Sequence, residues 1–245
     1  MNWPNLITTQ RKTLFILIDP DKDFPENEWL DRMNLLNEFR PDGILLGGSH
    51  LNNDHSEQII RMTKAITGIP VVAFPGDFSH VHPEVDGVLF LSLISGRNPE
   101  YLINQHVKFG LTLRKSGLSC LPTGYVLIDG GKQTSVSYVT QTQPVPANET
   151  DLAVATAVAG EMLGLKTIYL EAGSGANQHV PLEMIAAVKA EIGVPLIVGG
   201  GIRSAEQARA VYDAGADSIV VGNGFEHNPE ILREIVGVTE LVNSH

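Results

Sequence analysis

Short apolar runs alternate with amphipathic segments along the whole chain. Eight of these runs are almost continuously apolar, as expected for strands that are buried on both faces of a parallel sheet. The runs are residues 14–19, 43–48, 70–76, 87–93, 125–131, 167–173, 195–201 and 218–224. Most of them end in Gly, Asp, Glu or Ser, the residue types expected where a strand opens into a functional loop.

The segments between the runs have the periodicity of helices. In residues 26–39 the apolar side chains recur near one face, and Pro181 and Ser204 stand where helices are expected to start. The predicted helices are residues 26–39, 149–163, 181–191, 204–214 and 228–241. Strands that alternate with helices in this way predict an α/β fold, a (β/α)8 TIM barrel that forms a single domain over residues 1–245.

One connection departs from this alternation of strands and helices. Only the segment FPGDFSHVHPEVD, residues 74–86, separates the third run from the fourth, and it contains Pro75, Gly76 and Pro83. Such a segment is too short and too interrupted for a crossover helix. We therefore expect a modified barrel in which a loop replaces the third helix. The apolar gap in the outer wall would then need a ligand or a partner.

Composition limits the partners and the location. The chain has 17 basic and 28 acidic residues and a formal net charge of -11, which argues against a general nucleic-acid binder. Cys120 is the only cysteine, so no intrachain disulfide can form. The sequence has no secretion signal and no apolar stretch long enough to cross a bilayer. We expect a cytoplasmic protein without an integral membrane segment.

The last two loops carry the strongest chemical signal. In VGGGIRSAEQA (198–208) and VGNGFE (221–226), the glycines leave backbone N–H groups accessible, and a helix N-terminus follows. Barrels of this class often bind phosphate with the loops after strands seven and eight. The pattern predicts a phosphate site, with tight turns of no chemical purpose as the alternative.

Two other loops carry carboxylates. Asp19, Asp21 and Asp23 follow the first strand, where they could hold a hard cation such as Mg²⁺, act as acid or base, or form only a solvated turn. Glu171 ends the sixth strand beside glycines that could approach a phosphate. As a general base it could take a hydroxyl proton, or it could be a carboxylate that backbone donors satisfy. Ser49 could offer a hydroxyl to a cation or a phosphate.

A further set of apolar residues flanks the interrupted connection. Side chains of this kind usually form core, but beside a missing helix they could also line an apolar groove. The set consists of Phe74, Phe78, Phe90, Leu91, Leu93 and Ile94.

Together these stretches resemble a known family, the geranylgeranylglyceryl phosphate synthases and their bacterial relatives that transfer heptaprenyl groups. The matching stretches follow the family's order between residues 14 and 226. They are LIDPDK, DGILLGGSH, VVAFPGD, LSLISGRNPEYLI, PTGYVLIDGG, YLEAGSGA, VGGGIRS and VGNGFE. The IDPDK spelling is closer to the archaeal-type branch, because Leu17 and Ile18 stand where the heptaprenyl branch has a lysine before the aspartate.

The resemblance implies a function and a site. It implies a magnesium-dependent prenyltransferase that joins sn-glycerol 1-phosphate to a long polyprenyl diphosphate, such as geranylgeranyl diphosphate, by an ether bond, in ether-lipid biosynthesis. It also implies a homo-oligomer. Asp19 and Ser49 would bind Mg²⁺, and Glu171, with Asp19, would be catalytic, Glu171 as the base. The residues implied to bind glycerol 1-phosphate are Tyr169, Leu170, Glu171, Ala172, Gly173, Ser174, Gly175, Gly200, Gly201, Gly222 and Asn223.

Two other functions remain open from the residues. A barrel isomerase of phosphorylated sugars could use Asp19 and Asp129, at the ends of the first and fifth strands, as an acid–base pair. It would leave the apolar run from Phe74 to Ile94 without a use. A non-catalytic phosphate sensor would need neither Asp19 nor Glu171. A test of prenyl diphosphate binding distinguishes the transferase from the isomerase. Magnesium-dependent turnover would exclude the non-catalytic sensor.

Overall fold

Parallel strands close into an eight-stranded barrel, which confirms the fold class predicted from the apolar runs. The computed structural model describes residues 3–22, 25–48 and 55–244. The strands pair in chain order, and β1 closes the ring by pairing with β8. They are β1 (Thr13–Ile18), β2 (Gly43–Leu46), β3 (Val71–Ala73), β4 (Gly87–Leu93), β5 (Ser119–Leu127), β6 (Thr167–Glu171), β7 (Leu196–Gly199) and β8 (Ser218–Val221).

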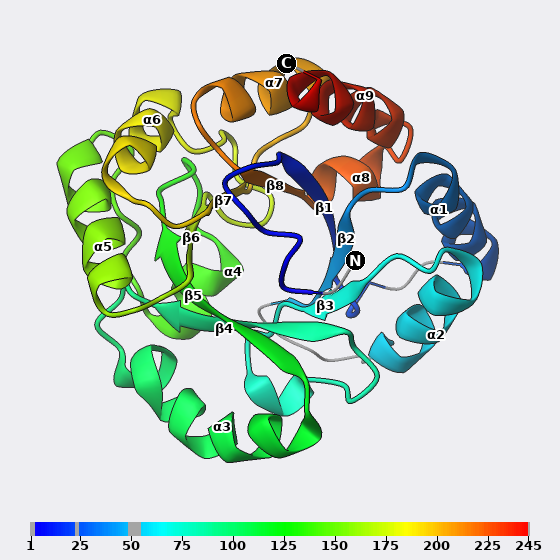
Figure 1. The fold of residues 1–245 in the computed structure, drawn as a ribbon, viewed down its shortest axis with the longest axis horizontal. Helices are drawn as coiled ribbons and strands as arrows, with labels where there is room; N and C mark the ends of the chain where they lie inside the picture. The colour runs from blue at the N-terminus through cyan, green and yellow to red at the C-terminus, as the bar shows by residue number, and fades with distance from the viewer. Residues whose placement is uncertain (1–2, 23–24, 49–54, 245) are drawn as a thin grey trace.

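Helices surround the barrel (Figure 1). The outer ring consists of α1 (Glu26–Phe39), α2 (Ser56–Ile66), α3 (Gln105–Ser116), α5 (Thr150–Met162), α6 (Leu182–Glu191), α7 (Ala205–Asp213) and α9 (Ile231–Asn243). Two short helices, α4 (Ser135–Thr140) and α8 (Asn223–His227), lie inside this ring, and the π-helical turn η2 (Glu100–Asn104) leads into α3. Among the described residues, no helix is long and apolar enough to cross a membrane.

The bounds of β5 differ from the prediction. The strand was expected at residues 125–131, but it spans Ser119–Leu127, and Ile128 forms only an isolated bridge with Val145. The early half of the strand contains Pro122 and Gly124, which have low strand propensity. Pairing with β4 from Ser119 to Tyr125 overrides that local preference.

The connection from β3 to β4 contains the 3-10 turn η1 (Phe78–His80). Asp77 caps this turn, because its side chain accepts a hydrogen bond from the Ser79 N–H. The Phe78 ring packs on Phe90 of β4, with 4.9 Å between the ring centroids, and on His106 of α3, with 5.4 Å. The side of the barrel between β3 and β4 is therefore covered by η1 and α3.

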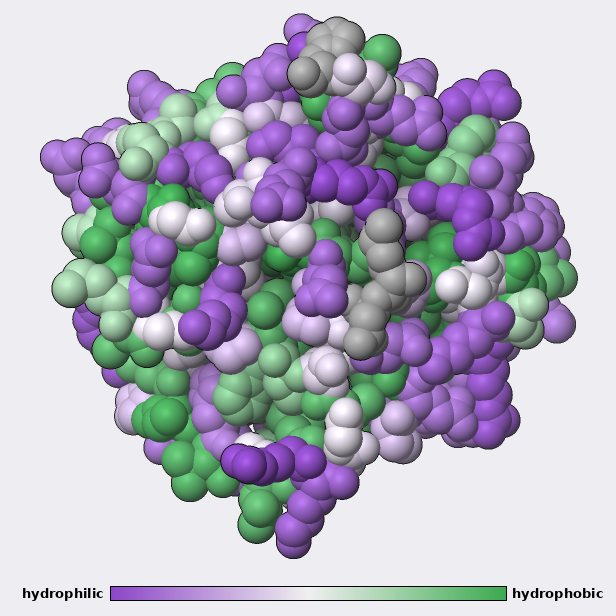
Figure 2. Space-filling view, in the orientation of Figure 1, coloured by the Kyte–Doolittle hydropathy of each residue, from purple (hydrophilic) through white to green (hydrophobic). Residues whose placement is uncertain are grey.

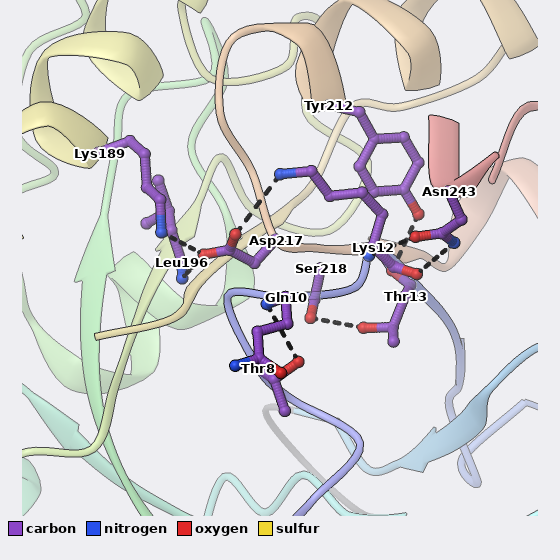
Figure 3. Close-up of polar contacts among 10 residues, drawn as sticks. All are labelled: Thr8, Gln10, Lys12, Thr13, Lys189, Leu196, Tyr212, Asp217, Ser218 and Asn243. Atoms are coloured by element: carbon purple, nitrogen blue, oxygen red, sulfur yellow. Dashed lines mark hydrogen bonds and ion pairs between the residues drawn. The ribbon is translucent and has the colours of Figure 1, made fainter. Parts of the chain in front are cut away.

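A buried ion-pair network holds the starts of three strands together (Figure 3). The Asp217 side chain is 1% exposed, and its carboxylate accepts a hydrogen bond of 2.9 Å from the Leu196 N–H. Lys189 lies 2.5 Å from one oxygen of this carboxylate, and Lys12 lies 3.4 Å from the other. Since these residues stand at the beginnings of β1, β7 and β8, the network stabilises the amino-terminal end of the barrel.

The N-terminal segment from Trp3 onward closes the same end of the barrel and crosses the middle of the ring in Figure 1. Trp3 is buried, its Nε1 donates a hydrogen bond to the Ser119 carbonyl, and its ring lies edge-on to Phe15. A Cβ atom at position 87 would come within 1.8 Å of the Trp3 ring, so Gly87 is required there. Among the described residues, a cavity opens at the opposite end, where the strands finish.

Candidate active site

A cavity opens at the carboxyl ends of the strands. The segments that follow β1, β2, β6, β7 and β8 form its walls, so residues from several sequence motifs meet there. The lining includes Asp19, Asp21, Gly48, Phe74, Tyr125, Glu171, Ser174, Gly175, Gly200, Gly201, Arg203, Gly222, Asn223 and Glu226.

Glu171 is the last residue of β6 and is buried in the wall of this cavity. Its Oε1 accepts a hydrogen bond of 2.6 Å from the Gly173 N–H. Burial raises the pKa of Glu171 to about 6, although the Tyr169 hydroxyl and the Gly173 N–H favour the charged form. A carboxylate with a pKa close to neutrality is suited to take up a proton and release it again.

Gly199, the last residue of β7, and Gly200, which follows it, make room for this carboxylate. A Cβ atom at position 199 would lie 2.3 Å from the Tyr169 hydroxyl and 2.7 Å from Glu171 Oε2. At Gly200, where φ is +80°, a Cβ atom would lie 2.5 Å from Glu171 Oε1. The glycines therefore give Glu171 its place, in addition to any access that they give a ligand.

Asn223 connects the loop after β6 to the loop after β8. Its Oδ1 accepts hydrogen bonds from the Ser174 hydroxyl at 3.0 Å and from the Gly175 N–H at 2.8 Å. Its Nδ2 donates to Glu226 Oε2 at 3.2 Å. Hydroxyl and backbone donors that converge on one oxygen atom in this way also suit an oxygen of a phosphate group.

Some predicted binding residues do not reach the cavity. Leu170 and Ala172 belong to the core between the barrel and its helices, because alternate residues of a strand face opposite sides. Tyr169 lies in the barrel interior, and Gly173 contributes its N–H to Glu171. Ser49, the second predicted magnesium ligand, lies outside the described residues.

The first loop brings Asp19 close to the loop after β8, since β1 and β8 are neighbours. Burial raises the pKa of Asp19 and the charge of Glu226 adds to the rise, whereas the Asp21 N–H and Lys22 lower it. Lys22 Nζ lies 3.1 Å from Glu226 Oε2. A Cβ atom at Gly48 would lie 2.8 Å from Asp19 Oδ1, so this glycine keeps the carboxylate accessible.

An apolar groove adjoins the polar cavity. Gly48, Phe74, Tyr125 and Val136 line both, so the two spaces lie side by side. The other residues of the groove are Pro75, Gly76, Phe78, Leu91, Leu93, Tyr101, Gln105, His106, Val139 and Thr140. Of the apolar set that could form core or groove, Phe90 and Ile94 instead pack against the core. This arrangement suits a ligand with one charged end and one long apolar end.

Several residues that line the cavity or the groove were not predicted from the sequence. Arg203 and Glu226 stand inside the two glycine motifs, so their position in those motifs was the available signal. The Arg203 guanidinium donates to the carbonyls of Ala176 and Asn177, which holds the loop after β6. Val136, like the rest of α4, has no local pattern that would assign it to the groove.

Asp129, the second acid expected of a sugar-phosphate isomerase, lies elsewhere. It follows β5, is exposed, and accepts a hydrogen bond from the Gly131 N–H at 2.9 Å. It does not line the cavity that contains Asp19. The structure therefore does not bring the expected acid–base pair together.

Known proteins are similar in sequence to this chain. The model of the PcrB family matches residues 6–239. A geranylgeranylglyceryl phosphate synthase from Spirosoma linguale is 45% identical, over 95% of this chain and 93% of the relative. One from Methanosphaera stadtmanae is 36% identical, over 99% of this chain and 98% of the relative.

Solved structures share the fold as well. The (S)-3-O-geranylgeranylglyceryl phosphate synthase from Thermoplasma acidophilum, in complex with its substrate sn-glycerol-1-phosphate, superposes with a TM-score of 0.87 at 32% identity, covering 94% of each chain. An N-acetylmannosamine-6-phosphate 2-epimerase from Clostridium perfringens has a TM-score of 0.56 at 12% identity, over 98% of this chain and 95% of the epimerase. The likeness to the epimerase shows the fold alone.

Proposed function

Because the chain belongs to the PcrB family of geranylgeranylglyceryl phosphate synthases, we propose that it joins a polyprenyl diphosphate to sn-glycerol 1-phosphate. This prenyl transfer forms an ether bond and releases diphosphate, as a step of ether-lipid biosynthesis. The observation that carries the proposal is that a glycine-rich polar cavity lies directly beside an apolar groove and shares four lining residues with it. One substrate is small and phosphorylated and the other is long and apolar, so each matches one part of this space.

The phosphate of glycerol 1-phosphate would be held by the loops after β6, β7 and β8. The Ser174 hydroxyl and the Gly175 N–H, which now donate to Asn223, are suitable donors. Gly200, Gly201 and Gly222 would let the phosphate approach the backbone, at the loops where barrels of this class bind it. Tight binding of this end fixes the orientation of the free hydroxyl.

Glu171 would act as the general base. The glycerol hydroxyl oxygen attacks the allylic carbon, the carbon–oxygen bond to diphosphate breaks, and the hydroxyl proton passes to the Glu171 carboxylate. The buried position next to Gly173 and Tyr169 supports this role, because it raises the pKa of Glu171 to about 6 without fixing the proton on it at neutral pH. Diphosphate leaves with the electron pair of the broken bond.

Asp19 fits the requirements of a magnesium ligand. It is a partly buried carboxylate with a raised pKa beside Glu226, and a cation would offset both the burial and the like charge. Within the described ranges no three His, Cys, Asp or Glu side chains converge on a metal position. This suits Mg²⁺, which is usually held by one or two carboxylates together with substrate phosphates. When bound, it would neutralise charge on the diphosphate. Ser49 is proposed as a second ligand.

The apolar groove would hold the prenyl chain. We propose that the segment with η1 takes the place of a crossover helix between β3 and β4, so that the chain could run between η1, α3 and α4. At ~0.8 kcal/mol for each buried CH2-sized group, ten buried carbons would contribute about 8 kcal/mol before ordering costs. The prenyl chain should therefore supply much of the affinity for the donor.

The family resemblance also favours a homo-oligomer. Light scattering of the purified protein measures its mass: a dimer or a larger assembly is expected, and a monomer at the concentration of the assay would contradict this part of the proposal.

Mass spectrometry of the reaction product tests the proposed function. The protein is incubated with Mg²⁺, sn-glycerol 1-phosphate and prenyl diphosphates of increasing length, and the organic phase is analysed. We expect a prenylglyceryl phosphate whose formation stops when EDTA removes the metal. If no donor gives this product while folded protein still binds glycerol 1-phosphate, the transferase proposal is wrong. Turnover of a sugar phosphate by the same preparation would then favour the isomerase.

A further inference from the structure

An exposed apolar stripe follows the outer side of η2 and α3. Ile103, Val107 and Leu111 succeed one another at intervals of four residues, so they lie on one face of the helix. They are 54%, 74% and 64% exposed. Figure 2 shows hydrophobic residues among hydrophilic ones along the lower left edge of the molecule, where Figure 1 places α3. Exposed apolar residues normally occur singly, whereas a row of them marks an interaction surface.

The same helix is locally basic. It carries Lys108, Arg114 and Lys115 and has no acidic residue, although acids outnumber bases by 28 to 17 in the chain. Lys108 pairs with Glu100 at 2.6 Å. Arg114 and Lys115 are exposed and form no ion pair with any residue that the structure describes. The stripe therefore carries free positive charge at its border.

The inner side of this segment belongs to the apolar groove. Tyr101 of η2 and Gln105 and His106 of α3 line it. The stripe on the outside and the groove on the inside are thus two faces of one helical segment.

We propose that the outer face of α3 docks on the surface of an anionic lipid bilayer. An interfacial helix places its apolar residues at the headgroup boundary, and basic residues beside them attract anionic lipids. Arg114 and Lys115, which form no ion pair with any residue that the structure describes, would supply this attraction, so the charge at the border of the stripe matches an anionic bilayer. The purpose of docking, exchange of a lipid substrate or product, rests on the proposed function.

Vesicle flotation without any substrate tests the docking directly. Wild-type protein should float with phosphatidylcholine vesicles that contain phosphatidylglycerol, should bind pure phosphatidylcholine vesicles much less, and should be released by added salt. Val107→Asp and Leu111→Asp should each weaken binding about tenfold or more, because each removes an apolar side chain from the lipid boundary. Arg114→Gln and Lys115→Gln should each weaken it about fivefold.

Matched controls come from another exposed apolar site. Met162 and Leu163, at the end of α5, are 84% and 80% exposed, so Met162→Asp and Leu163→Asp change charge and hydrophobicity equally but away from α3. These variants should float like the wild type, and circular dichroism should show that all variants are folded. The proposal is overturned if wild-type protein does not bind anionic vesicles or if the α3 variants float as well as the controls. It is also overturned if the α3 variants lower the oligomeric mass while flotation is unchanged, which would assign the stripe to a second copy. Since no turnover is measured, failure of the transferase proposal would leave these outcomes distinct.

Discussion

The buried carboxyl group of Glu171 makes the folded protein sensitive to pH. Burial raises its pKa from 4.5 to about 6, so the native state holds this proton more tightly than the unfolded chain does. The contribution of Glu171 to stability is therefore greatest below pH 4.5, falls as the pH rises from 4.5 to 6, and stays low at neutral pH. A difference of this size corresponds to roughly 2 kcal/mol.

Glu171→Gln should consequently be more stable than the wild type at neutral pH. We expect its free energy of unfolding to be about 1–2 kcal/mol higher at neutral pH, and this advantage to vanish in mildly acidic solution, because the amide does not ionise. Urea unfolding at both pH values measures it. Glu183→Gln, an exposed glutamate on α6, serves as the control and should show no such pH-dependent difference. An equal or lower stability of Glu171→Gln at neutral pH would mean that the charged carboxylate of Glu171 does not destabilise the folded state.

Replacement of Asp19 should change the dependence of turnover on magnesium. Asp19→Asn keeps the shape of the side chain but removes the charge that a hard cation prefers, so half-maximal turnover should need about tenfold more Mg²⁺ or more. The measurement is the rate of prenyl transfer against Mg²⁺ concentration. Asp129→Asn, which alters an exposed acid away from the cavity, should behave like the wild type. An unchanged magnesium response in Asp19→Asn would remove Asp19 from the metal site.

The residues of the candidate site could be predicted only in part. Asp19 and Glu171 could be predicted, because each lies at or near the end of an apolar run. The carboxyl ends of parallel strands meet at one end of the barrel. The ion pair of Lys22 with Glu226 joins residues 204 positions apart, and it arises from the closure of β1 on β8. No local pattern reports such a contact. The orientation of Leu170, in contrast, follows from the alternation of side chains along β6, because Leu170 is the neighbour of Glu171.

At the level of secondary structure, the network around Asp217 should matter for stability and not for chemistry. Asp217→Ala would leave Lys189 and the Leu196 N–H without their buried acceptor, so it should lower the free energy of unfolding by about 3–5 kcal/mol. Asp213→Ala on α7, which breaks an exposed pair with Arg209, should cost about 1 kcal/mol or less. Denaturant unfolding compares the two. A similar loss of unfolding free energy in both variants would contradict the conclusion that the Asp217 network stabilises the barrel.

The groove wall formed by α4 should select donors by length. Val139 lines the groove and is 36% exposed, so a Val139→Trp substitution can be accommodated while it narrows the groove. We expect kcat/KM to fall about tenfold for a long prenyl diphosphate and to stay close to the wild-type value for a five-carbon donor, since each buried carbon contributes to binding. Tyr138→Trp, at a neighbouring position outside the groove lining, is the control. Equal losses with both donors would place the prenyl chain elsewhere.

The helices differ in how much the sequence says about them. α1, α5, α6, α7 and α9 follow from their periodicity and helix starts. α3 escaped prediction because its apolar residues lie on two sides, Leu113 toward the core and Val107 and Leu111 toward solvent, so no single polar face appears. α4 and α8 are too short for a periodic pattern. The first half of β5 is set by its pairing with β4 and not by its own residues.

The molecule as a whole divides stability and chemistry between the two ends of the barrel. Trp3 and the Asp217 network close the amino-terminal end, and the cavity with its groove occupies the other. The barrel itself was predictable because buried parallel strands read as continuous apolar runs. The same fold occurs in an epimerase that is 12% identical, so function depends on the loops and on the groove beside η1.

The pH dependence of prenyl transfer tests most directly that Glu171 is the base at the meeting point of the two substrates. In the wild type, kcat/KM for glycerol 1-phosphate should be level at neutral pH and should fall below pH about 6, where Glu171 becomes protonated. Glu171→Gln should be slower by about 10²–10⁴-fold and should lose the part of this inflection that belongs to Glu171, while calorimetry shows glycerol 1-phosphate still bound. Near-normal turnover in Glu171→Gln would contradict the assignment of Glu171 as the base.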